Sequence, residues 1–131
     1  MAHKLEDLPI YARAEAFWGA INATLDMPRL RRDRKLHEQI SAANDSITSN
    51  MSEGFEQPTD KAFANFLTHS KASLAEVIQR LKQAHFKRHI SKETLDQHVT
   101  AGEELGKMLG GFIKYLRECD WNDRGSHGSS K

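Results

Sequence analysis

The fold is decided by the stretch DKAFANFLTHSKASLAEVIQRLKQAHF, residues 60–86. Its large apolar side chains recur at intervals of three and four residues, which is the spacing of one face of an α-helix. They are Phe63, Phe66, Leu67, Leu74, Val77, Ile78 and Leu81. Thr59 is suited to cap the first turn, and no proline interrupts the stretch. The stretch therefore predicts one long amphipathic helix.

Three further segments repeat this spacing on either side of the central stretch. The stripe of residues 9–25 is Ile10, Ala14, Phe17, Ile21 and Leu25. The stripe of residues 33–53 is Leu36, Ile40, Ala43, Ile47 and Met51. The stripe of residues 92–118 is Leu95, Val99, Leu105, Leu109, Phe112 and Leu116. No segment alternates apolar and polar residues as a strand does, so we expect an all-α protein.

Polar residues and a glycine mark the expected ends of these helices. Asp7 is placed to cap the first helix, and Ser91 is placed to cap the last. Gly54 fits a C-terminal cap for the second helix, because glycine readily adopts the left-handed conformation of such caps.

Short connections at 26–32, 54–59 and 87–91 join the four expected helices. Short connections make successive long helices antiparallel. We therefore expect an antiparallel up-down-up-down four-helix bundle over residues 1–119, followed by a flexible C-terminal tail at 120–131.

The composition restricts the class of protein. A chain of 131 residues fits one domain, and its single cysteine, Cys119, cannot form an internal disulfide. We find no signal peptide and no apolar run long enough to span a membrane, so we expect a cytoplasmic protein without a membrane role. The net charge of +1 gives no global argument for nucleic-acid binding, which must come from local clustering.

Two of the expected helices carry more small residues than a bundle core needs. Gly102, Gly106 and Gly110 form a ridge on the last helix. This ridge fits either close packing inside the bundle or a subunit contact. The first helix has an alanine face opposite its core stripe, made of Ala12, Ala16, Ala20 and Ala23. Alanine is a good helix former, but both surfaces together suggest a homo-oligomer.

Basic residues cluster in the first and third connections, which an up-down-up-down bundle places at the same end. The first cluster is Arg29, Arg31, Arg32, Arg34 and Lys35, with only Asp33 opposing it. The second is Lys82, Lys87, Arg88 and Lys92. Cations also suit helix C-termini, which is the structural alternative for Lys87 and Arg88. The first cluster exceeds that need, so we expect contacts to phosphate backbone of RNA or DNA.

Two further features of the sequence concern what the basic end and the opposite end of the bundle can bind. No aromatic residue interleaves with the first cluster, so stacking on single strands is not indicated. The opposite end is expected to collect acids, namely Glu6, Asp7, Glu53, Glu56, Asp60, Glu118 and Asp120.

The sequence gives little support for catalysis or for a cofactor. The segment HFKRH places His85 and His89 one helical turn apart, but the intervening cations oppose a metal ion. We expect no catalytic residue, no metal and no cofactor, and hence no enzyme. The polar stretch SITSNMSEG, residues 46–54, puts Ser46, Asn50 and Glu53 on one stripe. Glu53 could serve as a base, but we favour bonds from this stripe to backbone across the second connection.

Three motifs of the chain resemble the bacterial four-helix bundle protein family, also called the 23S rRNA intervening-sequence protein family. The first motif contains Ser46, Ile47, Asn50, Met51, Ser52, Glu53 and Gly54. The second contains Phe63, Phe66 and Leu67, and the third Ala72, Ser73, Leu74 and Glu76. The resemblance covers about residues 9–117. The chain departs from the pattern at Ala72 for glycine, Ser52 for alanine, and Asp45 for an apolar residue.

The resemblance implies the fold expected above and adds expectations about assembly. Family members are similar to the accessory protein of diversity-generating retroelements, a ring-shaped homopentamer that binds nucleic acid and a reverse transcriptase. It therefore implies a homo-oligomer, with a pentamer as the expected state, and RNA, DNA, a reverse transcriptase or another protein as partners. Residues and resemblance together predict a nucleic-acid-binding accessory protein, with a protein-interaction scaffold as the alternative.

Overall fold

The computed structural model describes residues 4–118, and every regular element in this range is helical. A 3₁₀ turn, η1 (Leu5–Asp7), precedes α1 (Pro9–Leu25) and the short α2 (Pro28–Arg32). Three long helices follow, α3 (Arg34–Phe55), α4 (Asp60–Phe86) and α5 (Lys92–Glu118). The predicted all-α class is confirmed. The predicted tail and Cys119 lie outside the described residues.

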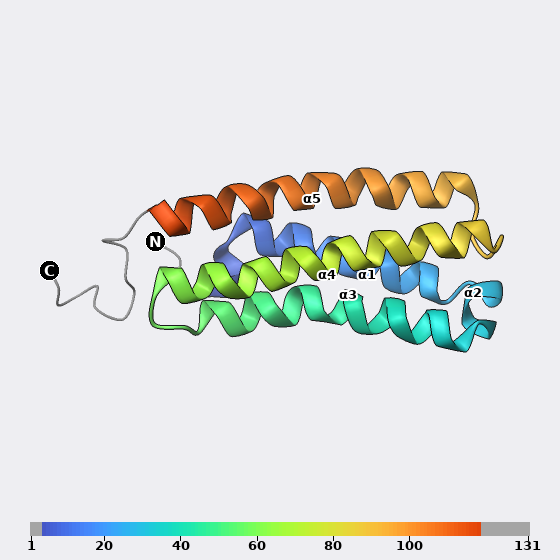
Figure 1. Ribbon diagram of the computed structural model, residues 1–131, viewed down its shortest axis with the longest axis horizontal. Helices are drawn as coiled ribbons and strands as arrows, with labels where there is room; N and C mark the ends of the chain where they lie inside the picture. The colour runs from blue at the N-terminus through green and yellow to red at the C-terminus, as the bar shows by residue number, and fades with distance from the viewer. Residues whose placement is uncertain (1–3, 119–131) are drawn as a thin grey trace, which may run out of the picture.

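The four long helices lie side by side as a bundle, and the chain reverses direction between each long helix and the next (Figure 1). Helix α3 packs most extensively on α4, α4 packs on α5, and α1 packs on both α3 and α5. The connections before α3 and before α5 lie at the same end of the molecule (Figure 1). This placement decides where the basic residues gather.

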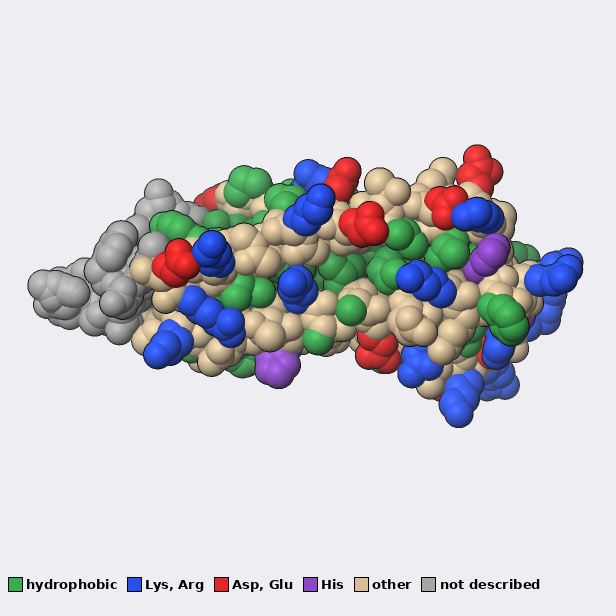
Figure 2. All heavy atoms as spheres, turned by 45° about the horizontal axis from the view of Figure 1, so that its top comes forward, with side chains coloured by type: hydrophobic (Ala, Val, Ile, Leu, Met, Phe, Trp, Pro, Cys, Tyr) green, Lys and Arg blue, Asp and Glu red, His purple; other side chains and the backbone are tan. Residues whose placement is uncertain are grey.

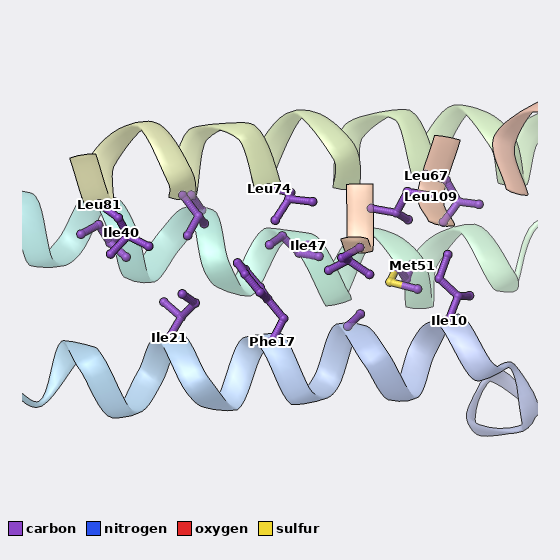
Figure 3. Close-up of a cluster of buried hydrophobic side chains, with 14 of the residues drawn as sticks. Ile10, Phe17, Ile21, Ile40, Ile47, Met51, Leu67, Leu74, Leu81 and Leu109 are labelled. Carbon is purple, nitrogen blue, oxygen red and sulfur yellow. The ribbon is translucent and has the colours of Figure 1, made fainter. Parts of the chain in front are cut away.

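The core is the meeting place of the four apolar stripes. Ile21, Ile40, Ile47, Leu67 and Leu109 are fully buried. Figure 3 shows side chains of α1, α3 and α4 interleaved along the bundle axis, with Leu109 reaching them from α5. Burying such side chains stabilises each by about 1.5–3 kcal/mol relative to exposure, so the stripes account for the association of the helices.

Polar groups also lie between α1 and α3. The Asn44 side chain is fully buried, and its Nδ2 donates to the backbone oxygen of Trp18 over 3.1 Å. The Trp18 indole Nε1 donates to Asp45 Oδ1 over 2.8 Å. Asp45, which departs from the family pattern, therefore holds an aromatic side chain of α1.

Two of the three predicted N-caps are confirmed. Thr59 Oγ1 accepts from the backbone N–H of Ala62 over 3.0 Å, and Ser91 Oγ accepts from that of Thr94 over 3.0 Å. The predicted cap at Asp7 is wrong. Asp7 lies in η1, and Leu8 occupies the N-cap position without a side-chain hydrogen bond. The Asp7 carboxylate instead accepts from the backbone N–H of Lys4 over 3.3 Å, and Pro9 suits the first position of α1 because its φ is already helical.

The predicted C-cap at Gly54 is also wrong. Helix α3 continues through Phe55 to a C-cap at Glu56, and no glycine among the described residues has positive φ. Gly54 is needed for space instead. A Cβ there would lie 2.8 Å from both Phe63 Cδ1 and Phe66 Cβ, which belong to the first turns of α4. The glycine lets α4 pack closely on the end of α3.

The glycine ridge of α5 divides between two roles. A Cβ at Gly102 would lie 2.9 Å from Ile78 Cδ1, so this glycine serves packing inside the bundle. A Cβ at Gly106 or Gly110 would meet its nearest neighbour at 3.7 or 3.6 Å, an ordinary contact distance. Packing inside the described chain therefore explains Gly102 but not the other two.

Candidate nucleic-acid interface

The first connection contains a helix, α2, where the sequence predicted none. Leu30 is fully buried and anchors α2 to the core, while Arg29, Arg31 and Arg32 on either side are exposed. A buried leucine between exposed arginines fixes the orientation of this single turn. The arginines therefore project from an ordered segment.

Helix α4 ends in a Schellman motif with an arginine in the usual glycine position. The N–H of His89 donates to the oxygen of Ala84, and the N–H of Arg88 to that of His85, both over 2.8 Å. Arg88 has φ of 66°, in the left-handed region. L-residues other than glycine pay about 1–2 kcal/mol there. An arginine kept at this cost is a candidate functional residue.

Asp33 joins the two connections. Its Oδ2 lies 2.9 Å from Lys87 Nζ and 2.9 Å from His89 Nε2, and its Oδ1 accepts from the N–H of Leu36 at the start of α3. The Lys87 ammonium first and the hydrogen bond to His89 second lower the pKa of Asp33 to about 2. Asp33 therefore neutralises part of the charge of Lys87.

A second bond joins the same segments. Arg29 Nη1 donates to the backbone oxygen of Arg88 over 3.2 Å. The connections form a shallow groove of about 470 Å³ between them, whose lining includes Met27, Arg29, His85, Arg88, His89 and Ile90. The groove thus brings together two arginines that are 59 positions apart in the chain.

We call this end of the molecule the basic end, comprising Arg29, Arg31, Arg32, Arg34, Lys35, Lys82, Lys87, Arg88 and Lys92. Lysine and arginine side chains crowd over it in Figure 2, whereas charges of both signs are interspersed along the rest of that face. Arg31, Arg32, Arg34, Lys35 and Arg88 are exposed, and their side chains form no ion pair within residues 4–118. Lys92, by contrast, pairs with Asp96 at 3.3 Å.

The expected acidic character of the opposite end is wrong in part. Glu6, Asp7, Glu53, Glu56 and Glu118 are exposed there. Asp60 is buried, with 3% of its surface exposed, and Asp120 lies outside the described residues. Exposed cations share this end, namely Lys4, Lys61, Lys114 and Arg117. The opposite end is therefore mixed, and only the basic end has one dominant sign.

The stretch 46–54 forms a polar contact in the middle of the bundle. Asn50 Nδ2 donates to the backbone oxygen of Ser46 over 2.8 Å and to its Oγ over 2.9 Å. Ser73 Oγ on α4 donates to Ser46 Oγ over 2.8 Å. These bonds lie within α3 and between α3 and α4, not across the second connection as expected. Small polar residues here allow the two helices to approach closely.

The two acidic residues of the family motifs lie outside this contact. Glu53 is exposed, and its carboxylate forms no hydrogen bond among the described residues, so the expected bond to the start of α4 is not formed. Glu76 is exposed and lies 3.7 Å from Arg80 on the same helix. Neither carboxylate faces a histidine or a nucleophile in the contacts of the described chain.

Sequence reasoning missed a buried histidine and an exposed phenylalanine. His98 is 6% exposed, its Nε2 lies 2.7 Å from Thr24 Oγ1, and burial lowers its pKa. Phe86, at the end of α4, is 87% exposed. Phe86 follows Lys82 by four residues, so the sequence indicates that these two side chains share a face of the helix. The exposed fraction of Phe86, however, depends on how α4 ends.

The described residues contain neither a metal-binding cluster nor a membrane-spanning helix. Within residues 4–118, no three side chains of the histidine, cysteine and acidic types gather closely enough to bind a metal ion. No helix in that range combines the length and the apolar character that crossing a bilayer requires.

The chain was compared with known families, curated proteins and solved structures. Neither the curated proteins nor the solved structures include a significant match. The family described as 23S rRNA-intervening sequence protein matches over residues 6–111. That range takes in α1 to α4, both basic connections and most of α5, and it contains the Ser46, Asn50 and Ser73 contact. The chain belongs to the 23S rRNA-intervening sequence protein family.

Proposed function

We propose that this protein is a non-catalytic, homo-oligomeric accessory protein that binds RNA or DNA through its basic end. The proposal takes the fold to be the antiparallel up-down-up-down four-helix bundle that the sequence predicts. The chain reversals in Figure 1 and the bond between Asp33 and Lys87 support that topology. The family description, which refers to an rRNA insertion, agrees with an RNA-associated role.

One observation carries the proposal, namely the joining of the first and third connections into one basic end with exposed, unpaired arginines. Arg31 and Arg32 lie in the first connection and Arg34 begins α3 directly after it, whereas Arg88 lies in the third connection. Arginine forms paired hydrogen bonds with phosphate oxygens. Such contacts displace counterions and give affinity without base specificity.

The test measures binding of generic RNA and of duplex DNA at several salt concentrations. About six phosphate contacts would weaken duplex binding roughly a thousandfold between about 50 and 200 mM salt. Replacing Arg31, Arg32 and Arg34 with glutamine should weaken binding and flatten the salt dependence. A matched control replaces the exposed Lys4, Lys61 and Lys114, which carry the same total charge away from the basic end.

Two outcomes would contradict the proposal. Affinity that does not depend on salt would exclude phosphate contacts as its source. Equal losses in the two triple variants would show that net charge, and not this end of the molecule, governs binding.

A protein-interaction scaffold is the second candidate, because α1 presents an exposed face of small apolar residues. Ala12, Ala16, Ala20 and Ala23 are all exposed. The client would be a reverse transcriptase or another protein. Recovery of a defined protein by pulldown after nuclease treatment, and its loss when Ala16 and Ala20 become glutamate, would favour this role.

A further inference from the structure

Phe86 is the most exposed of the large hydrophobic side chains in the described chain, at 87%, against 51% for Tyr115 and 38% for Trp18. Tyr115 stacks on Phe112 and Trp18 bonds to Asp45, whereas Phe86 takes part in no ring contact among residues 4–118. A single exposed apolar residue is common on protein surfaces. The surroundings of Phe86 are what distinguish it.

Cations surround Phe86 along the chain. Lys82 precedes it by four residues and so shares its face of α4, and Lys87 and Arg88 follow it directly. Residues 82–92 contain no acidic residue, so the ring stands among positive charges. The helix C-cap fixes the backbone beneath it, because the N–H groups of Lys87, Arg88 and His89 all bond to the last turn of α4. The ring is thus carried on an ordered support.

We propose that Phe86 stacks on an unpaired nucleobase, and that the basic end therefore prefers single-stranded polynucleotide to duplex. An exposed aromatic ring among cations matches the chemistry of a base with its flanking phosphates. A paired base inside a duplex has both faces covered by its neighbours and offers none to the ring. This inference rests on the proposed function and adds to it the strandedness of the ligand.

The adjoining groove completes the ligand site. Arg29 and Arg88 contribute cationic groups to it, Met27 and Ile90 apolar surface, and Ser91 a hydroxyl. Arg88 also lies two residues from Phe86. A strand whose base stacks on Phe86 can therefore place a neighbouring phosphate at Arg88.

The experiment compares labelled oligo(rU) and oligo(dT) of about 12 nucleotides with a duplex of equal length, by fluorescence anisotropy at one low salt concentration. The variants of the full chain are Phe86→Leu, Phe86→Tyr and the triple Arg31, Arg32, Arg34 to glutamine. Phe86→Leu should weaken single-strand binding about fivefold or more and leave duplex binding unchanged. Phe86→Tyr should retain single-strand binding, because tyrosine stacks equally well.

The two single-stranded probes distinguish RNA from DNA as the source of the base. Equal losses on oligo(rU) and oligo(dT) would show that the ring reads the base face, and a loss on one alone would assign that polymer as the ligand. Since Phe86 is exposed, its replacement leaves the core intact, which circular dichroism of each variant checks.

The remaining outcomes separate the stacking from the proposed function. If the triple variant loses both ligands and Phe86→Leu loses neither, the stacking inference fails and the basic interface stands. If neither variant loses affinity, both fail. A change in solution mass of Phe86→Leu without any change in single-strand affinity would assign the ring to a contact between copies of the chain and overturn the inference.

Discussion

At the scale of the residue, Arg88 is the position where the backbone favours glycine but the side chain supplies a positive charge. Its φ of 66° suits glycine, and the two hydrogen bonds of the α4 C-cap do not involve its side chain. The guanidinium is exposed beside the groove of the basic end. Stability and phosphate binding therefore make opposite demands on this position.

Arg88→Gly should stabilise the fold and weaken nucleic-acid binding. Glycine adopts the left-handed conformation without the strain that arginine bears there. The greater flexibility of glycine in the unfolded chain offsets part of this gain, so the free energy of unfolding should rise by up to about 1 kcal/mol. Urea denaturation measures the gain, and anisotropy with labelled RNA measures the binding loss. Arg34→Gly, in the first turn of α3, is the control, and it should lose stability. A variant that binds as tightly as the parent would remove Arg88 from the interface.

Gly54→Ala should destabilise the fold by about 1–3 kcal/mol, because its Cβ would overlap Phe63 and Phe66. The Phe66 Cβ is fixed to the backbone of α4, so rotation of a side chain cannot relieve that overlap. Gly19→Ala is the matched control, since a Cβ there meets nothing within 4 Å. It should stabilise by up to about 1 kcal/mol. Thermal unfolding of the two variants should shift in opposite directions.

His98 should make the fold less stable in mild acid. Burial lowers its pKa below the ordinary 6.5, so the unfolded chain takes up a proton before the folded chain does. The free energy of unfolding should therefore be constant above about pH 6.5 and fall below it. Denaturation at about pH 7.5 and 5.5 tests this, and His98→Gln should reduce the difference. An unchanged pH dependence in that variant would assign the effect to another group.

At the scale of the element, Asp33 holds α2 and the start of α3 against the end of α4. Asp33→Asn keeps a side-chain oxygen for the N-cap but removes the charge that faces Lys87 and His89. Since Lys87 is 53% exposed, the expected loss of stability at neutral pH is below about 1 kcal/mol. The stabilisation by Asp33 is present above pH 3.8 and is lost as the pH falls towards about 2, so the variant should lack this acid-dependent loss.

The same variant should bind RNA more tightly. It removes the acid of the first cluster and frees the ammonium of Lys87 for phosphate, so both low-salt affinity and the salt dependence should increase. The comparison is Asp96→Asn, which removes the acid that pairs with Lys92 at 3.3 Å on α5. Weaker binding by Asp33→Asn would mean that the bond between the connections, and not their charge, limits the interface.

The sequence predicted the helices well because their signals are local. Thr59 and Ser91 cap the helices they precede, and the ranges 9–25, 60–86 and 92–118 agree with the structure. Gly54 was misassigned because its role depends on where Phe63 and Phe66 of the next helix come to lie. The clustering of the basic residues followed from topology, but the pairing of Asp33 with Lys87 is a tertiary contact that spacing does not encode.

At the scale of the whole molecule, two different small-residue surfaces remain uncovered. One is the alanine face of α1, and the other runs past Gly106 and Gly110 beside α4. Because the surfaces differ, contact between them would be heterologous, which builds a ring when the rotation between successive copies closes on itself. This agrees with the pentamer that the family resemblance implies.

Substituting Ala16 and Ala20 with glutamate should reduce the solution mass to that of one chain, 14.9 kDa. Charges buried without partners at an interface are costly, whereas on an exposed helix face glutamate is well tolerated. Light scattering measures the mass, and circular dichroism checks the helices. The control replaces Ala42 and Ser49, which are exposed on α3 and belong to neither small-residue surface, with glutamate, and it should leave the mass unchanged. A parent chain that already has the mass of a monomer would contradict the assembly.

The buried bond from Asn44 to the Trp18 carbonyl has a consequence for the whole bundle. The apolar stripe of α1 would still face the core if α1 moved by one turn along α3, although Ala14 and Phe17 would then occupy layers that other side chains now fill. Sliding would leave the Asn44 amide in an apolar layer without its acceptor, at about 1–3 kcal/mol. Asn44 thereby sets the axial alignment of α1, and with it the reach that lets Arg29 meet Arg88.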